Sequence, residues 1–300
     1  MSEAEPGAGV ANPYAAPRAN VAQPAPAGAG ALIENGQRVG VGRGVAWIAE
    51  GFALFRKSPG TWIGTMLLFI FGSMIFAMIP IIGSLGINLL MPVFIAGFMI
   101  GCHALEEGEP LQVAHLFAGF KKNVGQLILV GLLYMIGAVV LGIAIAVIGG
   151  LGAFAAAASG ISDMGPLAYG AIAILVLVGI GLTLPLVMAY WFAPALVVFH
   201  DLDAMQAMKQ SFYGCLKNFL PYLVYGVVAF LLVLPISLPM ILGVVLLFAN
   251  LANTPVPPGL NTIILVSLPL TLGWLVLWPT MIAAMYASYR DIYAPYPGTE

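Results

Sequence analysis

Several residues of this sequence could hold a metal ion, because cysteines, histidines and carboxylates gather in two short segments. The first segment contains Cys102, His103, Glu106, Glu107, Glu109 and His115, and the second contains His200, Asp201, Asp203 and Cys215. Thiolate and imidazole ligands would favour zinc. The spacing matches no standard zinc site, however, and neighbours such as Cys102 and His103 do not readily aim at one ion. We therefore expect no metal and no other cofactor.

Other catalytic patterns are also missing from the sequence. The stretch Gly40-Val-Gly42-Val-Gly44 lacks the preceding strand and the spacing of a nucleotide-binding loop. Hydrolase, kinase and metalloprotease motifs do not occur. Glu107 and Glu109 stand before Pro110, which is typical of the solvated start of a helix. We expect no enzymatic activity.

The composition indicates an integral membrane protein. Hydrophobic residues make up 61% of the chain and charged residues only 7%, whereas soluble proteins have about 25% charged residues. The mean hydropathy is +1.03. A net charge of -2 with ten basic residues offers no surface for a polyanion. A nucleic-acid partner is therefore not expected.

Six apolar runs are long enough to cross a bilayer, which takes roughly 20 residues. They cover residues 62–82, 85–105, 124–148, 167–199, 219–249 and 260–289. Prolines in the three longest runs predict kinks. These prolines are Pro185, Pro194, Pro235, Pro239, Pro269 and Pro279.

The six runs form one predicted domain, residues 41–292. Residues 1–40 are rich in Ala, Pro and Gly and read as a disordered tail. Residues 293–300 form a second, short tail. The two cysteines are expected to be reduced thiols.

The basic residues predict the orientation of the domain. All ten lysines and arginines lie before the first run, between the second and third, between the fourth and fifth, or after the sixth. The loops on the other side, around Gly83 and in 150–166 and 250–259, contain only Asp163 as a charged residue. The positive-inside rule then predicts that both termini lie in the cytoplasm.

Ionisable residues are absent from the middle of the six runs, which argues against a pump or a proton-coupled carrier. His103 and His200 lie at the ends of runs. A few polar residues do occur inside the runs, and we expect them to hydrogen-bond between helices. They are Asn88, Thr183, Tyr190, Ser237 and Thr271.

Two sequence frames recur three times and predict an internal repeat. Phe52, Phe117 and Phe212 each begin the pattern Phe-x-x-(Phe/Cys)-x-Lys-(Ser/Asn), directly before an odd-numbered run. Pro92, Pro185 and Pro279 begin the pattern Pro-x-x-(Ile/Met)-Ala inside the even-numbered runs. The predicted fold is all-α, with six transmembrane helices in three hairpins, each preceded by a cytoplasmic amphipathic helix.

The three amphipathic helices are expected at 45–57, 110–122 and from Asp201 or Asp203 to Lys217, lying on the membrane surface. In the third helix, Gln206 follows Asp203 by three residues, as in a capping box. Their side chains form the candidate interaction face at the cytoplasmic side. It comprises Trp47, Phe52, Lys57, Phe117, Lys122, His200, Asp201, Phe212, Lys217 and Asn218.

Some of these stretches also carry a family resemblance. They are Trp191–Asp201, Ala207–Phe212, Cys215–Asn218, Pro221–Gly226 and, upstream, Trp47, Glu50-Gly51 and Phe55–Trp62. Over residues 40–292 the chain resembles an uncharacterised family of proteobacterial inner-membrane proteins. It is more distantly similar to the membrane domains of some glycerophosphodiester phosphodiesterases. The resemblance implies a bacterial plasma-membrane location and six helices, but no activity, since the phosphodiesterase catalytic domain is missing.

These observations predict a non-enzymatic membrane protein that organises or regulates partners or lipids at the cytoplasmic face. The expected partners are membrane lipids and a membrane or cytoplasmic protein. The alternative is a passive carrier or channel for a lipid or apolar solute, and an intramembrane enzyme is poorly supported. A carrier should have a polar or hydrated cavity at the midplane, lined from several spans.

Overall fold

The computed structural model describes residues 31–158, 165–253 and 260–294, and these residues form helices and no strands. Of the predicted tail, residues 1–30 lie outside the described residues. The helices are α1 Arg43–Lys57, α2 Pro59–Ala77, α3 Ile82–Glu106, η1 Val113–Lys121, α4 Val124–Ala158, α5 Pro166–Trp191, α6 Ala193–His200, α7 Ala204–Lys217, α8 Phe219–Asn253 and α9 Leu260–Tyr293.

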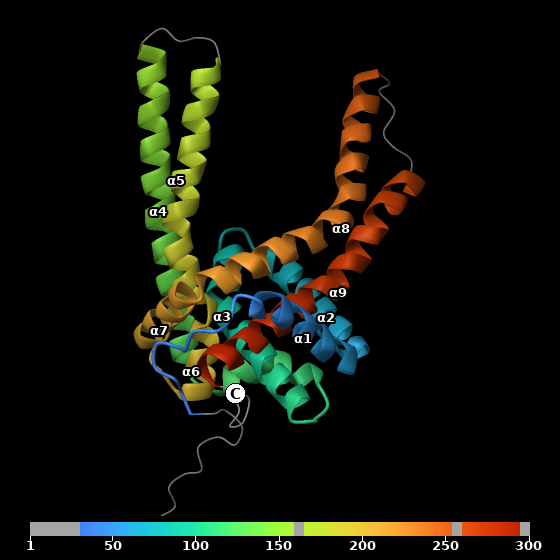
Figure 1. Cartoon of the computed structure of the whole chain (residues 1–300). Coiled ribbons are helices and arrows are strands. Elements are labelled where there is room, and N and C mark those ends of the chain that lie inside the picture. The colour runs from blue at the N-terminus through green and yellow to red at the C-terminus, as the bar shows by residue number, and fades with distance from the viewer. Residues whose placement is uncertain (1–30, 159–164, 254–259, 295–300) are drawn as a thin grey trace, which may run out of the picture.

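Six of these helices are long and apolar enough to cross a membrane, which confirms the predicted number of spans. They are arranged in chain order as the pairs α2–α3, α4–α5 and α8–α9. Figure 1 shows α4 and α5 rising side by side, while the paired ends of α8 and α9 rise separately from the same base. The candidate spans are Pro59–Ala77, Ile82–Glu106, Val124–Gly152, Ile172–His200, Phe219–Leu238 and Thr271–Tyr293.

The turn between the first two spans lies earlier in the chain than predicted. We expected it around Gly83, but α2 already ends at Ala77 and Gly83 is inside α3. Pro80 and Ile81 form the turn instead, and Ile81 has a positive φ of 63°. Gly83 serves another purpose, because a Cβ at this position would collide with the carbonyl oxygen of Phe76. It allows α3 to approach α2 closely at the turn.

The fourth predicted span is divided into two helices. The α5 helix ends at Trp191, and the short α6 begins at Ala193 with Pro194 in its first turn. Proline lacks a backbone N–H and clashes with the preceding turn, so the helix is interrupted before Pro194, where a kink was predicted. Pro185, in contrast, lies within α5. Asp201 then ends α6 in the left-handed conformation with φ 55°.

The second amphipathic helix differs from its prediction. An α-helix was expected from Pro110 to Lys122, whereas η1 is a 3₁₀ helix that begins at Val113. Pro110 therefore lies before the helix and not at its first position. The start is fixed by His115, whose Nδ1 accepts a hydrogen bond from the backbone N–H of Gln112 at 3.2 Å. The backbone of η1 also lies directly on α3, where a Cβ at Gly119 would collide with Val93.

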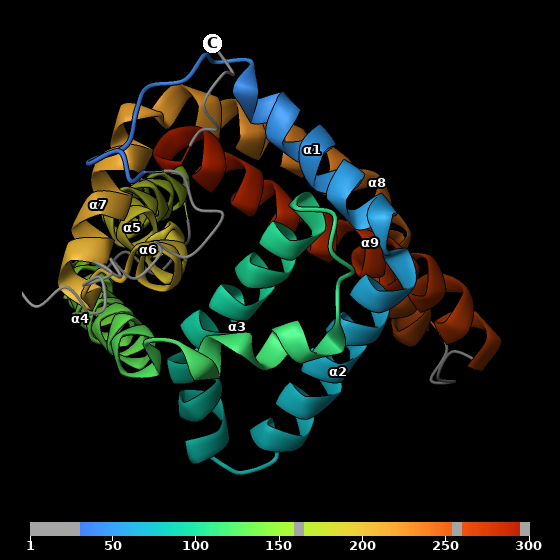
Figure 2. The ribbon, with the colours of Figure 1, turned by 90° about the horizontal axis from the view of Figure 1, so that it is seen from below.

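The first and third amphipathic helices lie where they were predicted, and all three amphipathic elements pack on transmembrane helices. α1 packs on α9, η1 on α3 and α7 on α5. Figure 2 shows α1 running along α8 and α9. A Cβ at Gly51 of α1 would lie 2.6 Å from the backbone nitrogen of Ala284, so these two helices touch through their backbones. Each element thus rests on the second helix of another hairpin, while the internal repeat stays a prediction.

The core of the described residues lies where these elements meet. Trp47, Trp62, Phe192 and Tyr293 are among its largest fully buried side chains. Large apolar side chains of the spans, for example Leu177 on α5, are exposed instead. An exposed apolar surface of this kind suits contact with lipid. The membrane-spanning helices therefore rise from a well-packed base that contains most of the charged groups.

Candidate functional site

The charged end of the molecule consists of α1, η1, α6, α7 and the last turns of α9. A segment that we call the strap, residues 31–42, lies across it from α7 to the start of α1 (Figure 2). Its backbone N–H groups at Ile33 and Gln37 donate to the carbonyl oxygens of Tyr293 and Ile292, both at 2.9 Å. The strap thereby satisfies carbonyl groups that the end of helix α9 would otherwise leave unpaired.

A tight turn holds the strap between α7 and α9. Asn35 and Gly36 both have positive φ, 57° and 62°, which is typical of an Asn-Gly turn. A Cβ at Gly36 would lie 2.5 Å from Cγ2 of Ile292 and 3.4 Å from Cα of Gly214. The positive φ and the close approach to the Ile292 side chain favour glycine at this place. The Nζ of Lys217 donates to the Gly36 carbonyl oxygen at 3.0 Å.

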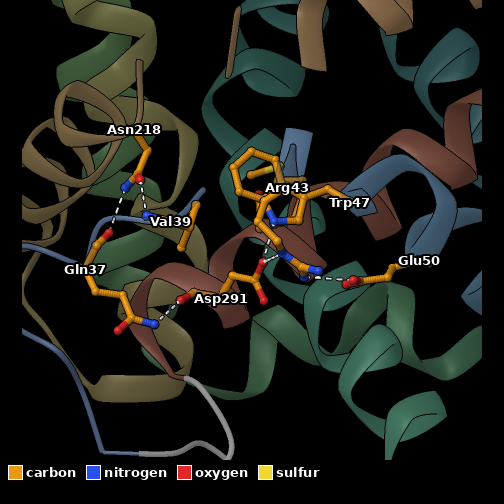
Figure 3. A network of polar contacts seen from close by, with 9 residues as sticks. Gln37, Val39, Arg43, Trp47, Glu50, Asn218 and Asp291 are labelled. Atoms are coloured by element: carbon orange, nitrogen blue, oxygen red, sulfur yellow. Dashed lines mark hydrogen bonds and ion pairs between the residues drawn. The ribbon is translucent and has the colours of Figure 1, made fainter. Parts of the chain in front are cut away.

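Asn218, at the junction of α7 and α8, binds the strap in the manner of a paired strand. Its Oδ1 accepts from the N–H of Val39 at 2.9 Å, and its Nδ2 donates to the carbonyl oxygen of Gln37 at 2.8 Å (Figure 3). The same Nδ2 donates to the Gly214 carbonyl at 2.9 Å. Asn218 is completely buried. Its amide is therefore fully used to join the strap to α7.

A charged cluster joins α1 to the end of α9. The Oδ2 of Asp291 accepts from Nε of Arg43 at 2.5 Å and from Nε1 of Trp47 at 2.7 Å. Arg43 also donates to Glu50 at 2.7 Å, as Figure 3 shows. Burial lowers the pKa of Arg43, but Asp291 and Glu50 outweigh it and raise the pKa overall. The predicted site residue Trp47 is thus a buried structural contact.

A second polar network connects α1, α3 and α9. Tyr286 donates to Glu106 at 2.7 Å, lies 3.0 Å from Nδ1 of His103, and Glu106 also pairs with Arg290. Lys57 donates to the carbonyl oxygen of Leu105 at 2.7 Å. Of these residues, Lys57, Glu106, Tyr286 and Arg290 border a small cavity of about 180 Å³. Because the acidic and basic side chains of this cluster pair with each other, we interpret the cluster as a structural contact that connects the three helices.

Three further predicted site residues meet between η1 and α7. Asp201 accepts from Asn123 Nδ2 at 2.7 Å, and Lys122 Nζ lies 3.5 Å from its carboxylate. The neighbouring His200 Nε2 lies 2.7 Å from the hydroxyl of Tyr289. The start of α7 is close by, where Asp203 Oδ1 accepts from the N–H of Gln206 at 2.9 Å, which confirms the predicted cap.

The remaining aromatic residues of the predicted face do not come together with these groups. Phe52 is 42% exposed and has the guanidinium of Arg56 5.3 Å from its ring centre. Phe117 is 46% exposed on η1. Phe212 is half-buried on α7, with its ring 5.6 Å from that of Tyr213. The predicted face is thus divided between residues that connect helices and aromatic side chains that are exposed or half-buried.

The residues considered for zinc do not converge. Over the described part of the chain, no three His, Cys, Asp or Glu side chains form a group that could hold a metal. Cys102 and Cys215 are free and buried. Burial raises the pKa of the Cys215 thiol, so the reactive thiolate is disfavoured. In the first segment, burial lowers the pKa of His115 although Glu109 opposes this.

An apolar crevice of about 530 Å³ lies between the second and third hairpins. It is lined by four residues of α5 between Leu184 and Trp191, by Cys215 of α7, and by seven residues of α8 between Phe219 and Phe230. None of these residues is charged. The Nε1 of Trp191 is buried and has no partner among the described residues. Figure 1 shows α5 and α8 leaving the charged end in different directions.

Two more cavities along the spans have a similar character. One, of about 520 Å³, lies between α1, α8 and α9, and the other, of about 530 Å³, lies between α2 and α9. Apart from Thr280 in the first and Thr271 in the second, their linings are apolar or aromatic. These three cavities suit hydrocarbon and not a hydrated solute.

Two polar residues inside the spans do not behave as predicted. Asn88 donates to the carbonyl oxygen of Ser84 at 2.8 Å, and Thr183 donates to that of Gly179 at 2.7 Å. Both bonds stay within one helix, whereas contacts between helices were expected. A carbonyl four residues earlier is always within reach of a threonine on a helix, so the polar group can be satisfied without a neighbour.

Sequence reasoning missed two parts of this region. The strap was included in the predicted tail, although the dipeptide Asn35-Gly36 is a strong turn signal. The crevice was missed because its lining residues, such as Leu184 and Val227, are ordinary apolar residues of a span. Gly226 alone offered a hint, since glycine in a membrane helix often marks close packing.

Comparison with known proteins supports the cellular location. The chain is 27% identical over 209 residues to a probable inner membrane protein of Burkholderia thailandensis, and the match covers 65% of this chain and 74% of that protein. No family model matches the chain, and no solved structure matches it significantly. With six candidate spans, the chain is a multi-pass inner-membrane protein. Similarity to phosphodiesterase membrane domains stays a prediction.

Proposed function

We propose that this protein is a non-enzymatic membrane protein that binds lipid in the crevice between α5 and α8, and so organises lipid at the cytoplasmic face. The observation that carries the proposal is the crevice itself, an uncharged cavity of about 530 Å³ formed by two spans. Ligand pockets typically measure about 300–1,000 Å³. Hydrocarbon chains of the surrounding bilayer are the apolar ligand that is always present at this place.

The aromatic floor of the crevice suits the polar end of an acyl chain. Trp191, Tyr222 and Tyr225 line the crevice toward α7. Tryptophan and tyrosine are favoured where hydrocarbon meets the headgroup layer, because each has an apolar body and a polar tip. We therefore expect an acyl chain to enter the crevice with its ester end toward α7.

Two glycines show how the crevice differs from a closed contact between hairpins. In the predicted repeat, Gly131 and Gly226 hold the same place, four residues after Leu127 and Tyr222. A Cβ at Gly131 would lie 2.5 Å from the carbonyl oxygen of Leu89, so α4 touches α3 there. A Cβ at Gly226 would meet nothing within 4 Å. The packing glycine of α8 thus faces free space that lipid can fill.

The proposed orientation in the membrane and the proposed family rest on the amino-acid sequence. The positive-inside rule supports a cytoplasmic charged end with both termini on that side. We further propose membership in the uncharacterised proteobacterial family that the chain resembles. A protein partner would find the exposed Phe52 and Phe117 at the charged end. Passive carriage of a lipid or apolar solute is the second candidate, which the same apolar crevice would serve.

The test fills the crevice without disturbing a helix contact. Gly226→Phe places a ring in the crevice, and Gly142→Phe is the matched control, because Gly142 is an exposed residue of α4 with nothing within 4 Å of a Cβ. Bound lipid is counted by native mass spectrometry after gentle purification. We expect Gly226→Phe to lower lipid retention about tenfold, equivalent to about 1.4 kcal/mol. Equal retention by both variants would exclude the proposal.

A flux measurement then separates the two candidate functions. Wild-type protein is reconstituted in liposomes with a fluorescent lipid in one leaflet. Retention of lipid without movement between leaflets supports the organising role. Movement that Gly226→Phe abolishes and Gly142→Phe leaves intact would transfer the proposal to passive carriage.

A further inference from the structure

The strap joins the end of α9 to the junction of α7 and α8, next to the helix that forms the floor of the crevice. On one side it is bound to the end of α9 through the N–H groups of Ile33 and Gln37. On the other side it is bound to the end of α7 through Lys217 and Asn218. The strap therefore spans from the third hairpin to α7.

Helix α7 carries this connection onward to the second hairpin. The hydroxyl of Ser211 donates to the carbonyl oxygen of Met188 at 2.6 Å and accepts from the N–H of Phe192 at 2.9 Å. Ser211 is completely buried, and α7 packs along α5. Cys215, one turn further along α7, lines the crevice. The floor of the crevice is thus a helix held to α5 by Ser211, and to α9 by the strap and by Tyr293, whose hydroxyl donates to the Gln210 carbonyl oxygen at 2.6 Å.

We infer that the strap is a latch that sets the width of the crevice between α5 and α8, and that its release lets the crevice change width and lose its lipid. The ligand part of this inference rests on the proposed function, whereas the movement does not. Large contacts between α5 and α8 themselves are not found among the described residues. The position of α5 relative to α8 therefore depends on α7 and on what holds α7.

The strap is built to detach as a unit. It is held by hydrogen bonds at its outer part, and its inner part contains Gly40 and Gly42, at which a Cβ would meet nothing within 4 Å. Among the described residues, the carbonyl oxygens of these two glycines accept only local hydrogen bonds, from Arg43, Val45 and Ala46 at the start of α1. This inner part can therefore act as a hinge before α1 without breaking a contact with α7 or α9. The turn at Gly36 is the opposite case, because a Cβ there would overlap the Ile292 side chain and Gly36 has a positive φ.

A matched pair of substitutions within the strap tests the latch. Gly36→Val cannot keep a positive φ beside Ile292 and should detach the turn, whereas Gly40→Val changes an uncontacted glycine of the same segment. Asn218→Ala is a second variant that leaves the turn intact and removes the contacts with Gln37 and Val39. Hydrogen exchange of the strap amides reports whether the strap has detached.

The width of the crevice is measured by electron spin resonance between labels on Leu177→Cys of α5 and Leu231→Cys of α8, two exposed positions outside the crevice. Lipid-free detergent keeps this distance independent of the proposed function. We expect Gly36→Val and Asn218→Ala to shift it by more than about 2 Å, the scale of regulated rearrangements, and Gly40→Val to match the wild type.

Three outcomes of these measurements test whether the strap acts as a latch. A detached strap with an unchanged distance would overturn the latch. A strap that stays protected in Gly36→Val and Asn218→Ala would also overturn it, since the contacts would then not hold the strap. A shifted distance between the labels on α5 and α8 supports the latch. If lipid retention is then the same as in the wild type, the latch still holds and only the proposal that the crevice binds lipid is contradicted.

Discussion

Replacement of Asn218 by alanine probes the central contact of the charged end. Asn218 is completely buried, and its side chain makes two hydrogen bonds to the strap and one to Gly214. A hydrogen bond contributes about 1 kcal/mol net, and a buried group left without a partner costs about 1–3 kcal/mol. The Gly214 carbonyl keeps the backbone N–H of Asn218 as a donor. The strap should therefore lose about 2–4 kcal/mol of its binding free energy.

Hydrogen exchange of the amides of Ile33 and Gln37 is the suitable assay. Their acceptors, the carbonyl oxygens of Tyr293 and Ile292, are not touched by the substitution, so faster exchange reports opening of the whole strap. Since 1.4 kcal/mol corresponds to a factor of ten, we expect exchange to be about 30 to 1,000 times faster. Asn88→Ala serves as the control, because the Asn88 side chain donates to Ser84 of its own helix. Exchange within about threefold of the wild type would refute the reasoning from Asn218, since that factor corresponds to less than about 1 kcal/mol.

Two further predictions concern η1 and the contacts between hairpins. The lowered pKa of His115 means that the folded state disfavours the protonated imidazole. The neutral His115 side chain therefore stabilises the fold above the ordinary histidine pKa of 6.5, and this stabilisation is lost as the pH falls below 6.5. Exchange of η1 amides, corrected for the intrinsic pH dependence, should accelerate below that pH in the wild type and not in His115→Gln; a flat profile would contradict the capping role. Gly131→Ala should destabilise the protein by about 1–3 kcal/mol through overpacking against Leu89, whereas Gly226→Ala should stabilise it by about 0.5–1 kcal/mol. Thermal unfolding in detergent measures the stability of both variants. If both substitutions changed stability in the same direction, the difference in packing between Gly131 and Gly226 would be disproved.

The spans and the first and third amphipathic helices could be predicted because each rests on a local property of the sequence. A run of apolar residues predicts a span, and the spacing of Asp203 and Gln206 predicts a helix start. The break before Pro194 was also predictable, since the clash of proline with the preceding turn depends on no distant residue. The turn at Pro80 and Ile81 was misplaced because two apolar runs with a short connection give little indication of where the turn falls.

The arrangement of the helices could not be predicted in the same way. Trp47 was placed on an interaction face as part of an amphipathic helix and Asn218 as part of the recurring frame before a span, but both are buried by elements distant in the chain. Trp47 binds Asp291, which is 244 residues away. The crevice depends on how α5 and α8 diverge, and no local pattern in either helix fixes that angle. Contacts of long sequence separation therefore decide which candidate residues remain accessible.

Photochemical mapping of lipid contacts tests the central claim most directly. The protein is reconstituted with phospholipids that carry a diazirine near the ester end of the acyl chain, irradiated and digested, and the modified residues are identified by mass spectrometry. Binding in the crevice predicts that adducts concentrate on the crevice-lining residues between Leu184 and Trp191 and between Tyr222 and Phe230. Adducts spread over all spans in proportion to exposure, with Leu184 and Tyr222 no more labelled than exposed Val140 of α4, would contradict it.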